Sequence, residues 1–153
     1  MLKHVTTGPD IDLARDIFRE YQQAIGVDLC FQDFDQELAN LPGEYAPPSG
    51  CLLFWYEGND LAGCAALRKI NGTTCEMKRM YVRSAFRGKK IGRKLAESIV
   101  AEARELGYKS LKLDTLPAMR EAIALYRSLG FKETPPYRVN PHPGAVYMEL
   151  DLS

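Results

Sequence analysis

The chain has 153 residues, 46% of them hydrophobic and 26% charged, and its 20 basic and 20 acidic side chains give a formal net charge of zero. This length predicts one domain over residues 1–153, and the balanced charge disfavours nucleic acid as a partner. The longest apolar run, CLLFWY, is far shorter than the ~18–20 residues of a membrane span, and the first ten residues lack the apolar core of a secretion signal, so we expect a cytoplasmic protein that does not enter a membrane.

The first third of the chain predicts a short strand followed by two helices. In HVTTGPDIDLARDIFREYQQAIG, apolar residues recur at a spacing near 3.6, which is typical of an amphipathic helix. Asp10 or Asp12 would cap this helix, because a carboxylate accepts hydrogen bonds from the free N–H groups of the first turn. A second, shorter helix ends near Leu41, and a loop rich in Pro and Gly follows it.

Three strands are expected next. The runs CLLFWYEG and LAGCAALRKI are joined at GND, which is a hairpin signal. The third run, TTCEMKRMYV, reads as a strand whose side chains alternate between two faces. On this reading one face carries Thr74, Glu76, Lys78, Met80 and Val82, and the other carries Cys75, Met77, Arg79 and Tyr81.

The second half of the chain alternates between helices and strands. A helix begins inside 85–95 and ends before Gly107, the strand SLKLDTL follows, and a further helix has Pro117 in its first turn and Gly130 just past its end. GFKE and AVYMELDLS are closing strands. This order predicts the α/β class, with a mixed sheet covered by helices on both faces.

The stretch AFRGKKIGRKL places an unusual cluster of positive charge at a helix start. Cations there oppose the helix dipole, which costs a few tenths of a kcal/mol or more each. A multiply charged anion bound at the free N–H groups would reverse this penalty, and Gly88 and Gly92 would let the backbone approach it closely. We therefore expect a phosphate or pyrophosphate site, with a merely solvated helix start as the alternative. The cations are Arg87, Lys89, Lys90, Arg93 and Lys94.

Here the chain resembles a known family. MYVRSAFRGKKIGRKL is similar to the acetyl-coenzyme A signature of the GNAT N-acetyltransferases, (Q/R)xxGx(G/A), with Arg87 at its first position and Gly92 at its last. AIALYRSLGF is similar to the family's second signature, with its Tyr and closing Gly-Phe. Lys90 stands at the signature's middle glycine, and Met119 stands where members often carry Asn. The resemblance runs from about residue 50 to the end.

The resemblance implies a GNAT-like acyl-coenzyme A N-acyltransferase fold with acetyl-coenzyme A as co-substrate. No metal is expected, because the chain has only two histidines and no cysteine pair with the spacing of a metal clip. The strand 74–83 should splay from its parallel neighbour 110–115 and leave a gap for the pantetheine arm. The residues expected to bind the cofactor are Met80, Tyr81, Val82, Arg87, Gly88, Lys89, Lys90, Ile91, Gly92 and Arg93.

Three residues are candidates for the chemistry of acetyl transfer, which needs a neutral amine and a proton for the leaving thiolate. Tyr126 matches the family's tyrosine at the coenzyme A sulfur, unless it is a core residue. Glu76 lies at the offset of a general base in histone-acetylating members, unless it pairs with Lys78 or Arg79. Asp114 lies at the offset of a Glu in ribosomal-protein-acetylating members, unless it caps a turn. We expect Glu76 to be the more important because it should share a face with Met80 and Val82.

The acceptor is expected to be a small or amino-acid-like amine. An acidic and aromatic roof containing Glu37 and Tyr45 suits a cationic amine, and a loop with Tyr137, Arg138 and Asn140 offers Arg138 to an acceptor carboxylate. The oligomeric state is left open, a homodimer included.

Two other classes remain as alternatives. The first is an acyl-coenzyme A sensor or a degenerate, non-catalytic member, which Lys90 and Met119 would permit. The second is Cys–His nucleophilic catalysis, which the scattered cysteines and the two histidines disfavour. No cysteine pair has the spacing of a zinc clip, so we expect free, buried thiols at Cys30, Cys51, Cys64 and Cys75.

Overall fold

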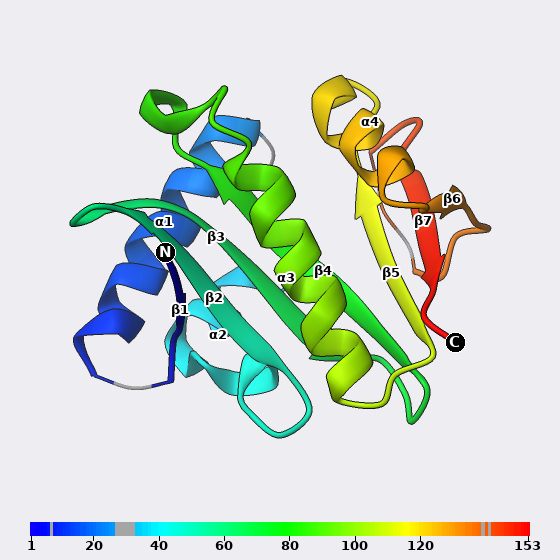
Figure 1. The fold of residues 1–153 in the computed structure, drawn as a ribbon, viewed down its shortest axis with the longest axis horizontal. Coiled ribbons are helices and arrows are strands. Elements are labelled where there is room, and N and C mark those ends of the chain that lie inside the picture. The colour runs from blue at the N-terminus through cyan, green and yellow to red at the C-terminus, as the bar shows by residue number, and fades with distance from the viewer. Residues whose placement is uncertain (7, 27–32, 139, 141) are drawn as a thin grey trace.

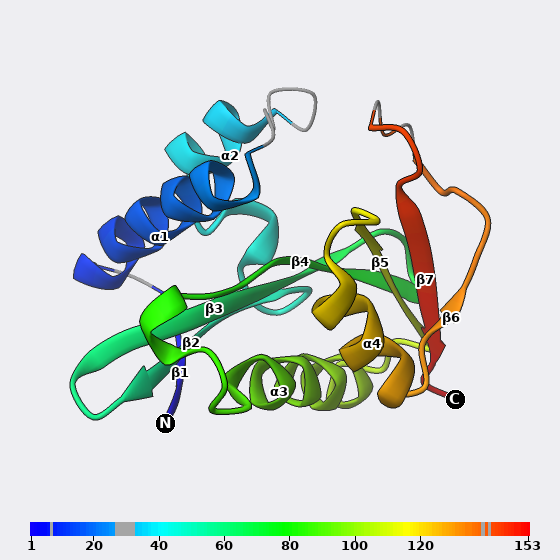
Figure 2. The same cartoon turned by 90° about the horizontal axis from the view of Figure 1, so that it is seen from above.

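The computed structural model describes residues 1–6, 8–26, 33–138, 140 and 142–153. These residues form a seven-stranded sheet with two α-helices on each face (Figures 1 and 2). In Figure 2, α1 and α2 lie above the sheet, and α3 and α4 lie below it. The predicted α/β class, with a mixed sheet covered on both faces, is confirmed.

The helices and strands follow the chain in the predicted order. Two 3-10 turns, at Gly43–Tyr45 and Ser84–Phe86, join them. The bounds are β1 Leu2–His4, α1 Pro9–Ile25, α2 Phe34–Asn40, β2 Cys51–Glu57, β3 Asp60–Lys69, β4 Thr74–Val82, α3 Ile91–Glu105, β5 Ser110–Thr115, α4 Arg120–Ser128, β6 Lys132–Glu133 and β7 Val146–Asp151.

The sheet order is β1-β2-β3-β4-β5-β7-β6. The predicted hairpin joins β2 and β3, and its two-residue connection pairs Glu57 with Asp60. Neighbouring strands are antiparallel except β4 and β5, which run parallel because α3 connects them across one face. The parallel pair therefore lies near the middle of the sheet, where helices cover both faces.

Two hydrophobic clusters hold the layers together. Ile17 and Phe18 of α1 pack on one face of the sheet, and Leu95 and Ile99 of α3 pack on the other, all with fully buried side chains.

The predicted free, buried thiols are confirmed at Cys51, Cys64 and Cys75, and Cys30 lies outside the described residues. Within the described residues, no helix combines the length and apolar character that crossing a bilayer requires.

The helix ends differ in part from the predictions. Neither Asp10 nor Asp12 caps α1, because the helix begins at Pro9 and both carboxylates lie in its first turn, where they face the positive end of the dipole. Pro117 lies outside α4, which begins only at Arg120. The predicted C-terminal glycines are confirmed: Gly107 and Gly130 have φ values of 88° and 102° just past α3 and α4.

A bulge in β4 changes which residues share a face. Arg79 has a φ of 58°, and the register with β3 shifts so that two residues of β4 stand opposite one of β3. Met80 and Val82 consequently pack toward α3 and α4 together with Met77. Glu76 points to the opposite face, toward α1 and α2. The prediction that Glu76 shares a face with Met80 and Val82 is therefore wrong, because simple alternation cannot include an extra residue.

Candidate active site

The parallel strands β4 and β5 pair along only part of their length. Thr74, Cys75 and Glu76 pair with the first three residues of β5, and beyond Glu76 the two strands separate. Figure 1 shows them close together at the lower right and diverging toward the top. The predicted splayed pair is confirmed, and the split leaves main-chain groups of β4 available to a ligand.

A groove of about 1040 Å³ runs along this split. It is lined by the end of β4, the 83–90 loop, the first turn of α3, and α4. Of the ten residues expected to bind the cofactor, nine line the groove, and Lys89 instead holds its amine 5.7 Å from the centre of the Phe86 ring. The nine are Met80, Tyr81, Val82, Arg87, Gly88, Lys90, Ile91, Gly92 and Arg93.

The start of α3 has the properties of an anion site. No side chain caps it, and no acidic residue lies in its first turn, so its N–H groups lie at the groove together with Arg87, Lys90 and Arg93. Lys90 is the N-cap and has a φ of 62°, a conformation that glycine adopts freely. Lys90, at the position of the signature's middle glycine, therefore has a backbone conformation that favours glycine. Arg93 donates a hydrogen bond of 2.6 Å to Ser128, which ties α3 to α4 across the groove.

A smaller cavity of about 60 Å³ adjoins the groove. Tyr126 and Met80 line both spaces, and Asp114 and Asn140 line the small one. Tyr126 is 5% exposed, burial raises its pKa, and within the described residues its hydroxyl makes no hydrogen bond. The phenol thus stays protonated where the two spaces meet. Asp114 accepts a 3.2 Å hydrogen bond from Asn140.

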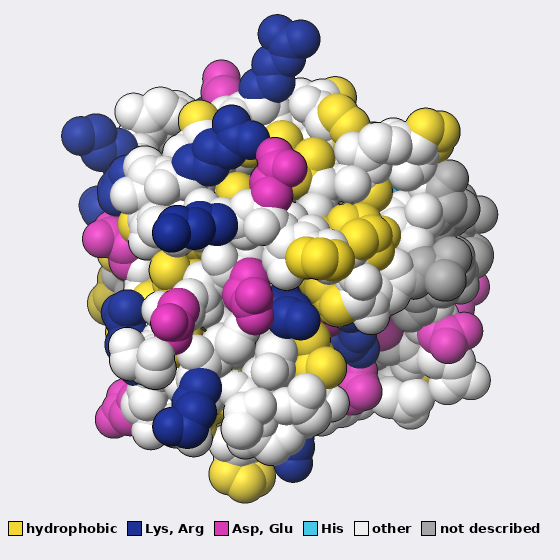
Figure 3. Space-filling view, turned by 90° about the vertical axis from the view of Figure 1, so that its right-hand side faces the viewer, with side chains coloured by type: hydrophobic (Ala, Val, Ile, Leu, Met, Phe, Trp, Pro, Cys, Tyr) yellow, Lys and Arg dark blue, Asp and Glu magenta, His cyan; other side chains and the backbone are white. Residues whose placement is uncertain are grey.

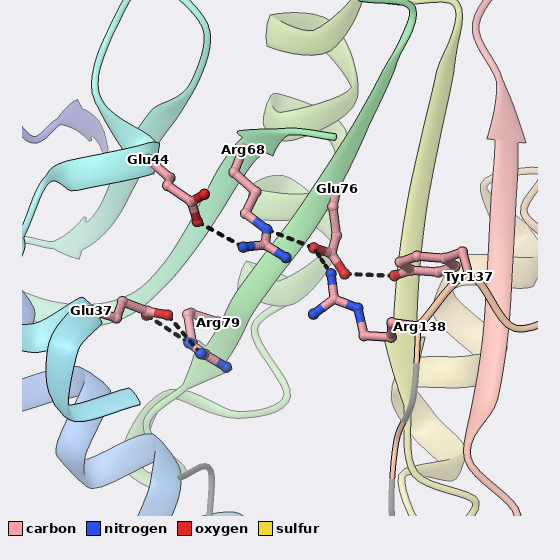
Figure 4. Close-up of polar contacts among 7 residues, drawn as sticks. All are labelled: Glu37, Glu44, Arg68, Glu76, Arg79, Tyr137 and Arg138. Atoms are coloured by element: carbon pink, nitrogen blue, oxygen red, sulfur yellow. Dashed lines mark hydrogen bonds and ion pairs between the residues drawn. The ribbon is translucent and has the colours of Figure 1, made fainter. Parts of the chain in front are cut away.

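Glu76 lies at the centre of a buried polar network (Figure 4). Its side chain has no exposed surface, and its carboxylate accepts hydrogen bonds from Arg68 at 2.8 Å, from Tyr137 at 2.6 Å and from Arg138. Burial raises the pKa of Glu76, but the positive charges of Lys78, Arg138 and Arg68 outweigh it and hold that pKa below its usual range. Neither cavity is lined by Glu76 in the described part of the chain.

The two residues expected in an acidic and aromatic roof take other places. Glu37 holds Arg79 through two hydrogen bonds of 2.8 Å, and Tyr45 is 2% exposed and packs against Phe18 in the core. Neither residue lines the small cavity.

Sequence reasoning missed the buried cations of β4. Lys78 and Arg79 are 6% and 3% exposed, and both line the small cavity. The available signal was their position: two charges in the middle of a strand that helices cover on both faces must be buried and must have partners.

Figure 3 views the side of the molecule that carries α4, β6 and β7. Basic and acidic side chains are interspersed there around exposed apolar groups. Charges of both signs therefore share this face.

The split strands, the basic helix start and the groove between them define the class of protein: an acyltransferase that uses coenzyme A. The chain belongs to the GNAT acetyltransferases, because the model of the "Acetyltransferase (GNAT) family" matches residues 11–131. It is an acetyl-coenzyme A-dependent N-acetyltransferase of that type, and the predicted family is confirmed.

A relative agrees with this assignment, and solved structures share the fold. An uncharacterized N-acetyltransferase of Schizosaccharomyces pombe is 44% identical over 146 residues, which cover 94% of this chain and 90% of that protein. The crystal structure of an acetyltransferase from Streptococcus agalactiae has a TM-score of 0.81 at 21% identity, and the superposition covers 99% of this chain and 97% of that chain. A GNAT family acetyltransferase from Elizabethkingia anophelis, solved with acetyl-coenzyme A bound, has a TM-score of 0.69 at 20% identity and covers the same shares.

Proposed function

We propose that this enzyme transfers the acetyl group of acetyl-coenzyme A to the amine of a small, amino-acid-like acceptor by direct attack. The observation that carries the proposal is the junction at Tyr126, where a groove of cofactor size meets a small polar cavity. A donor in the groove and an acceptor in the cavity would meet at this tyrosine.

Different residues of the groove would bind different parts of the cofactor. The pyrophosphate would lie at the start of α3, where Arg87, Lys90 and Arg93 supply positive charge. The pantetheine arm would follow the split and use main-chain groups of Met80 to Val82. Gly88, with a φ of 85°, shapes the loop that approaches the phosphates.

The reaction then needs few protein groups. The amine nitrogen attacks the thioester carbonyl, the C–N bond forms and the C–S bond breaks. Tyr126 would donate its proton to the departing sulfur. A phenol has a pKa near 10 and a thiol one near 8.5, so transfer from Tyr126 to the thiolate is uphill by only about 2 kcal/mol before burial is counted.

The acceptor end favours an amine that carries a carboxylate. Arg138 keeps its Nε buried without a hydrogen-bond partner within the described residues, although another nitrogen of its guanidinium pairs with Glu76. An orphaned, buried donor is costly. Arg138 does not itself line the small cavity, but Asn140 of the same loop does, and an acceptor carboxylate that entered beside Asn140 would satisfy this donor. Asp114, which lines the cavity, would attract the ammonium group of the same molecule.

The test is a panel of amino acids and matched simple amines, with free thiol release and product mass as readouts. Release of coenzyme A together with an acetylated amine is the expected result. Tight binding of acetyl-coenzyme A without product from any amine would instead support a non-catalytic sensor.

Replacing Arg87 tests the phosphate site. Arg87→Ala should raise the KM for acetyl-coenzyme A roughly tenfold, equivalent to about 1.4 kcal/mol, with a smaller change in kcat. The reason is that a phosphate contact is present in the ground state and the transition state alike. Because exposed charges are screened by salt, the variant should also show a shallower salt dependence of coenzyme A binding.

The control is Arg104→Ala, which removes an exposed cation in the last turn of α3. A large fall in kcat at unchanged KM would refute the phosphate role.

Replacing Arg138 tests the acceptor carboxylate. Arg138→Gln should raise the KM for an amino-acid acceptor about 10- to 100-fold, the value of a charged hydrogen bond of about 1.5–3 kcal/mol. The KM for the same molecule without its carboxylate should barely change. The ratio of the two KM changes therefore separates the loss of this contact from a general effect of the substitution on the site. Arg127→Gln, at an exposed ion pair with Glu133, is the control. Equal effects on both acceptors would argue against the contact.

A further inference from the structure

Lys78 is a buried lysine without a role in the acetyl transfer as proposed so far. It lies on β4 one residue before the bulge, is 6% exposed and lines the small cavity together with Asp114 and Tyr126. Met77 packs toward α3, so Lys78 points to the opposite face, where Arg138 reaches the sheet. The lysine therefore shares one cavity with the acceptor loop and with the tyrosine that meets the cofactor groove.

Three arginines act on the Lys78 amine. Arg79 is its neighbour on β4, Arg68 comes from β3 and Arg138 from the loop between β6 and β7. Glu76 opposes them, but its carboxylate already accepts hydrogen bonds from two of these arginines. Burial, and after it the charge of Arg79, lower the pKa of Lys78 to about 7. At neutral pH a large share of the molecules therefore holds an uncharged amine.

The other ionisable groups around the cavity, within the described residues, are Asp114 of β5, Tyr126 of α4, Tyr21 of α1 and His142 of the loop before β7. Burial raises the pKa of both tyrosines, so they remain protonated and neutral. Asp114 adds a negative charge that favours the cationic form of an acceptor. A bound ammonium group thus needs a partner that removes its proton.

We propose that Lys78 is the general base of the reaction, and that its uncharged amine takes a proton from the ammonium group of the acceptor. This rests on the proposed function, because it assigns one step of that acetyl transfer. A base works best when its pKa lies near the working pH. An exposed lysine has a pKa far above neutrality, whereas a lysine buried among other cations can have one near 7.

The protons balance in this scheme. The acceptor ammonium gives one proton to the Lys78 amine, and the resulting neutral nitrogen attacks the thioester carbon. As the C–N bond forms and the C–S bond breaks, Tyr126 protonates the sulfur. The second proton that the nitrogen loses on becoming an amide replaces the one that Tyr126 gave, and Lys78 returns its proton to solvent.

Glu76 is poorly suited to this step. Its carboxylate is fully buried, lies off the cavity and is held by cations that favour its charged form. A carboxylate stabilised in this way is a weak base.

Two substitutions at Lys78 separate a base from a fixed positive charge. Lys78→Met removes the amine and keeps the length, and Lys78→Arg keeps the charge but cannot give it up at neutral pH. Both should lower kcat/KM about 100-fold or more at pH 7, and both should move the acidic limb of the pH profile from near 7 toward the pKa of the free acceptor. Lys69→Met, at the exposed end of β3, is the control. Wild-type activity in Lys78→Arg would show that only the charge matters and would overturn the base.

A second measurement reads the protonation of Lys78 directly and does not depend on turnover. The side-chain amine of Lys78 is followed by nuclear magnetic resonance in the wild-type enzyme bound to coenzyme A, and Lys78→Arg assigns its signal. Titration between pH 6 and 8 is expected, and an amine that remains charged to pH 9 would overturn the proposal. If no amine is acetylated while Lys78 titrates near 7, the proposed function has failed and the base with it; if amines are acetylated and Lys78 stays charged, only the base has failed.

Discussion

Tyr126→Phe should lose about 10²- to 10⁴-fold in kcat while keeping the fold and the affinity for acetyl-coenzyme A. The substitution removes one oxygen and leaves the ring in the core, where it packs 5.7 Å from the centre of the Phe131 ring. Because no hydrogen bond of the hydroxyl exists within the described residues, folding should hardly respond to its removal. What disappears is the donor at the junction of the two cavities.

The loss should appear in kcat rather than in the KM for acetyl-coenzyme A. An interaction with the departing sulfur forms mainly in the transition state, whereas the phosphates and the pantetheine amides supply most of the binding. The barrier should therefore rise by about 3–5 kcal/mol. Since burial raises the pKa of Tyr126, no loss of this acid is expected on the basic side of the pH profile below pH 10.

Tyr108→Phe provides the matched control. Tyr108 is also buried, but its hydroxyl donates a 2.5 Å hydrogen bond to the main-chain oxygen of Ser49, beyond the end of α3 and away from both cavities. This variant should lose about 1 kcal/mol of stability and no activity. A Tyr126→Phe enzyme as active as the wild type would return Tyr126 to the core and leave water as the proton donor.

Local patterns in the sequence predicted much of the fold. The hairpin at GND, the periodic helices and the glycines at positions 107 and 130 depend on neighbouring residues only. The basic helix start was equally local, because its penalty arises from charges within one turn. Nine of the ten residues expected at the cofactor accordingly line the groove.

The acceptor side depends on contacts that no local pattern encodes. The bulge at Arg79 reverses the faces of β4 beyond it, and its stabilising partner, Glu37, is 42 residues away in sequence. Glu76 likewise receives hydrogen bonds from Tyr137 and Arg138, more than 60 residues downstream. Glu76, which the sequence offered as a candidate base, is therefore held in a buried network. No sequence motif marked the nearby buried Lys78.

Glu76→Gln should destabilise the protein strongly, lowering the free energy of unfolding by about 3–5 kcal/mol. Glutamine keeps the size of glutamate but removes the charge that balances the guanidinium groups of Arg68 and Arg138. Removing one partner of a buried ion pair leaves the other charge buried and uncompensated, which is where the large cost arises. The midpoint and slope of urea unfolding would measure this loss.

The destabilisation should depend on pH with a definite sign. Since the pKa of Glu76 is lower in the folded than in the unfolded chain, its charge contributes stability that is fully present above the unfolded value of 4.5. That contribution is lost as the pH falls through the folded pKa, because the protonated acid then resembles glutamine. The gap between wild type and variant should therefore be wide at pH 6–7 and close progressively below about pH 4.5.

Glu44→Gln is the control that separates burial from charge. Glu44 accepts a 2.7 Å hydrogen bond from the same Arg68, but its side chain is 70% exposed, so the loss should be about 1 kcal/mol or less. If both variants lose equal stability, the cost comes from the shared arginine and not from burial of Glu76.

The activity of Glu76→Gln distinguishes two further roles. If this variant is as stable as the wild type at pH 7 but loses the acidic limb of its activity profile, Glu76 is the general base and its hydrogen-bond network does not stabilise the fold. If it is destabilised and the surviving folded enzyme shows a raised KM for the acceptor alone, Glu76 acts by positioning Tyr137 and Arg138.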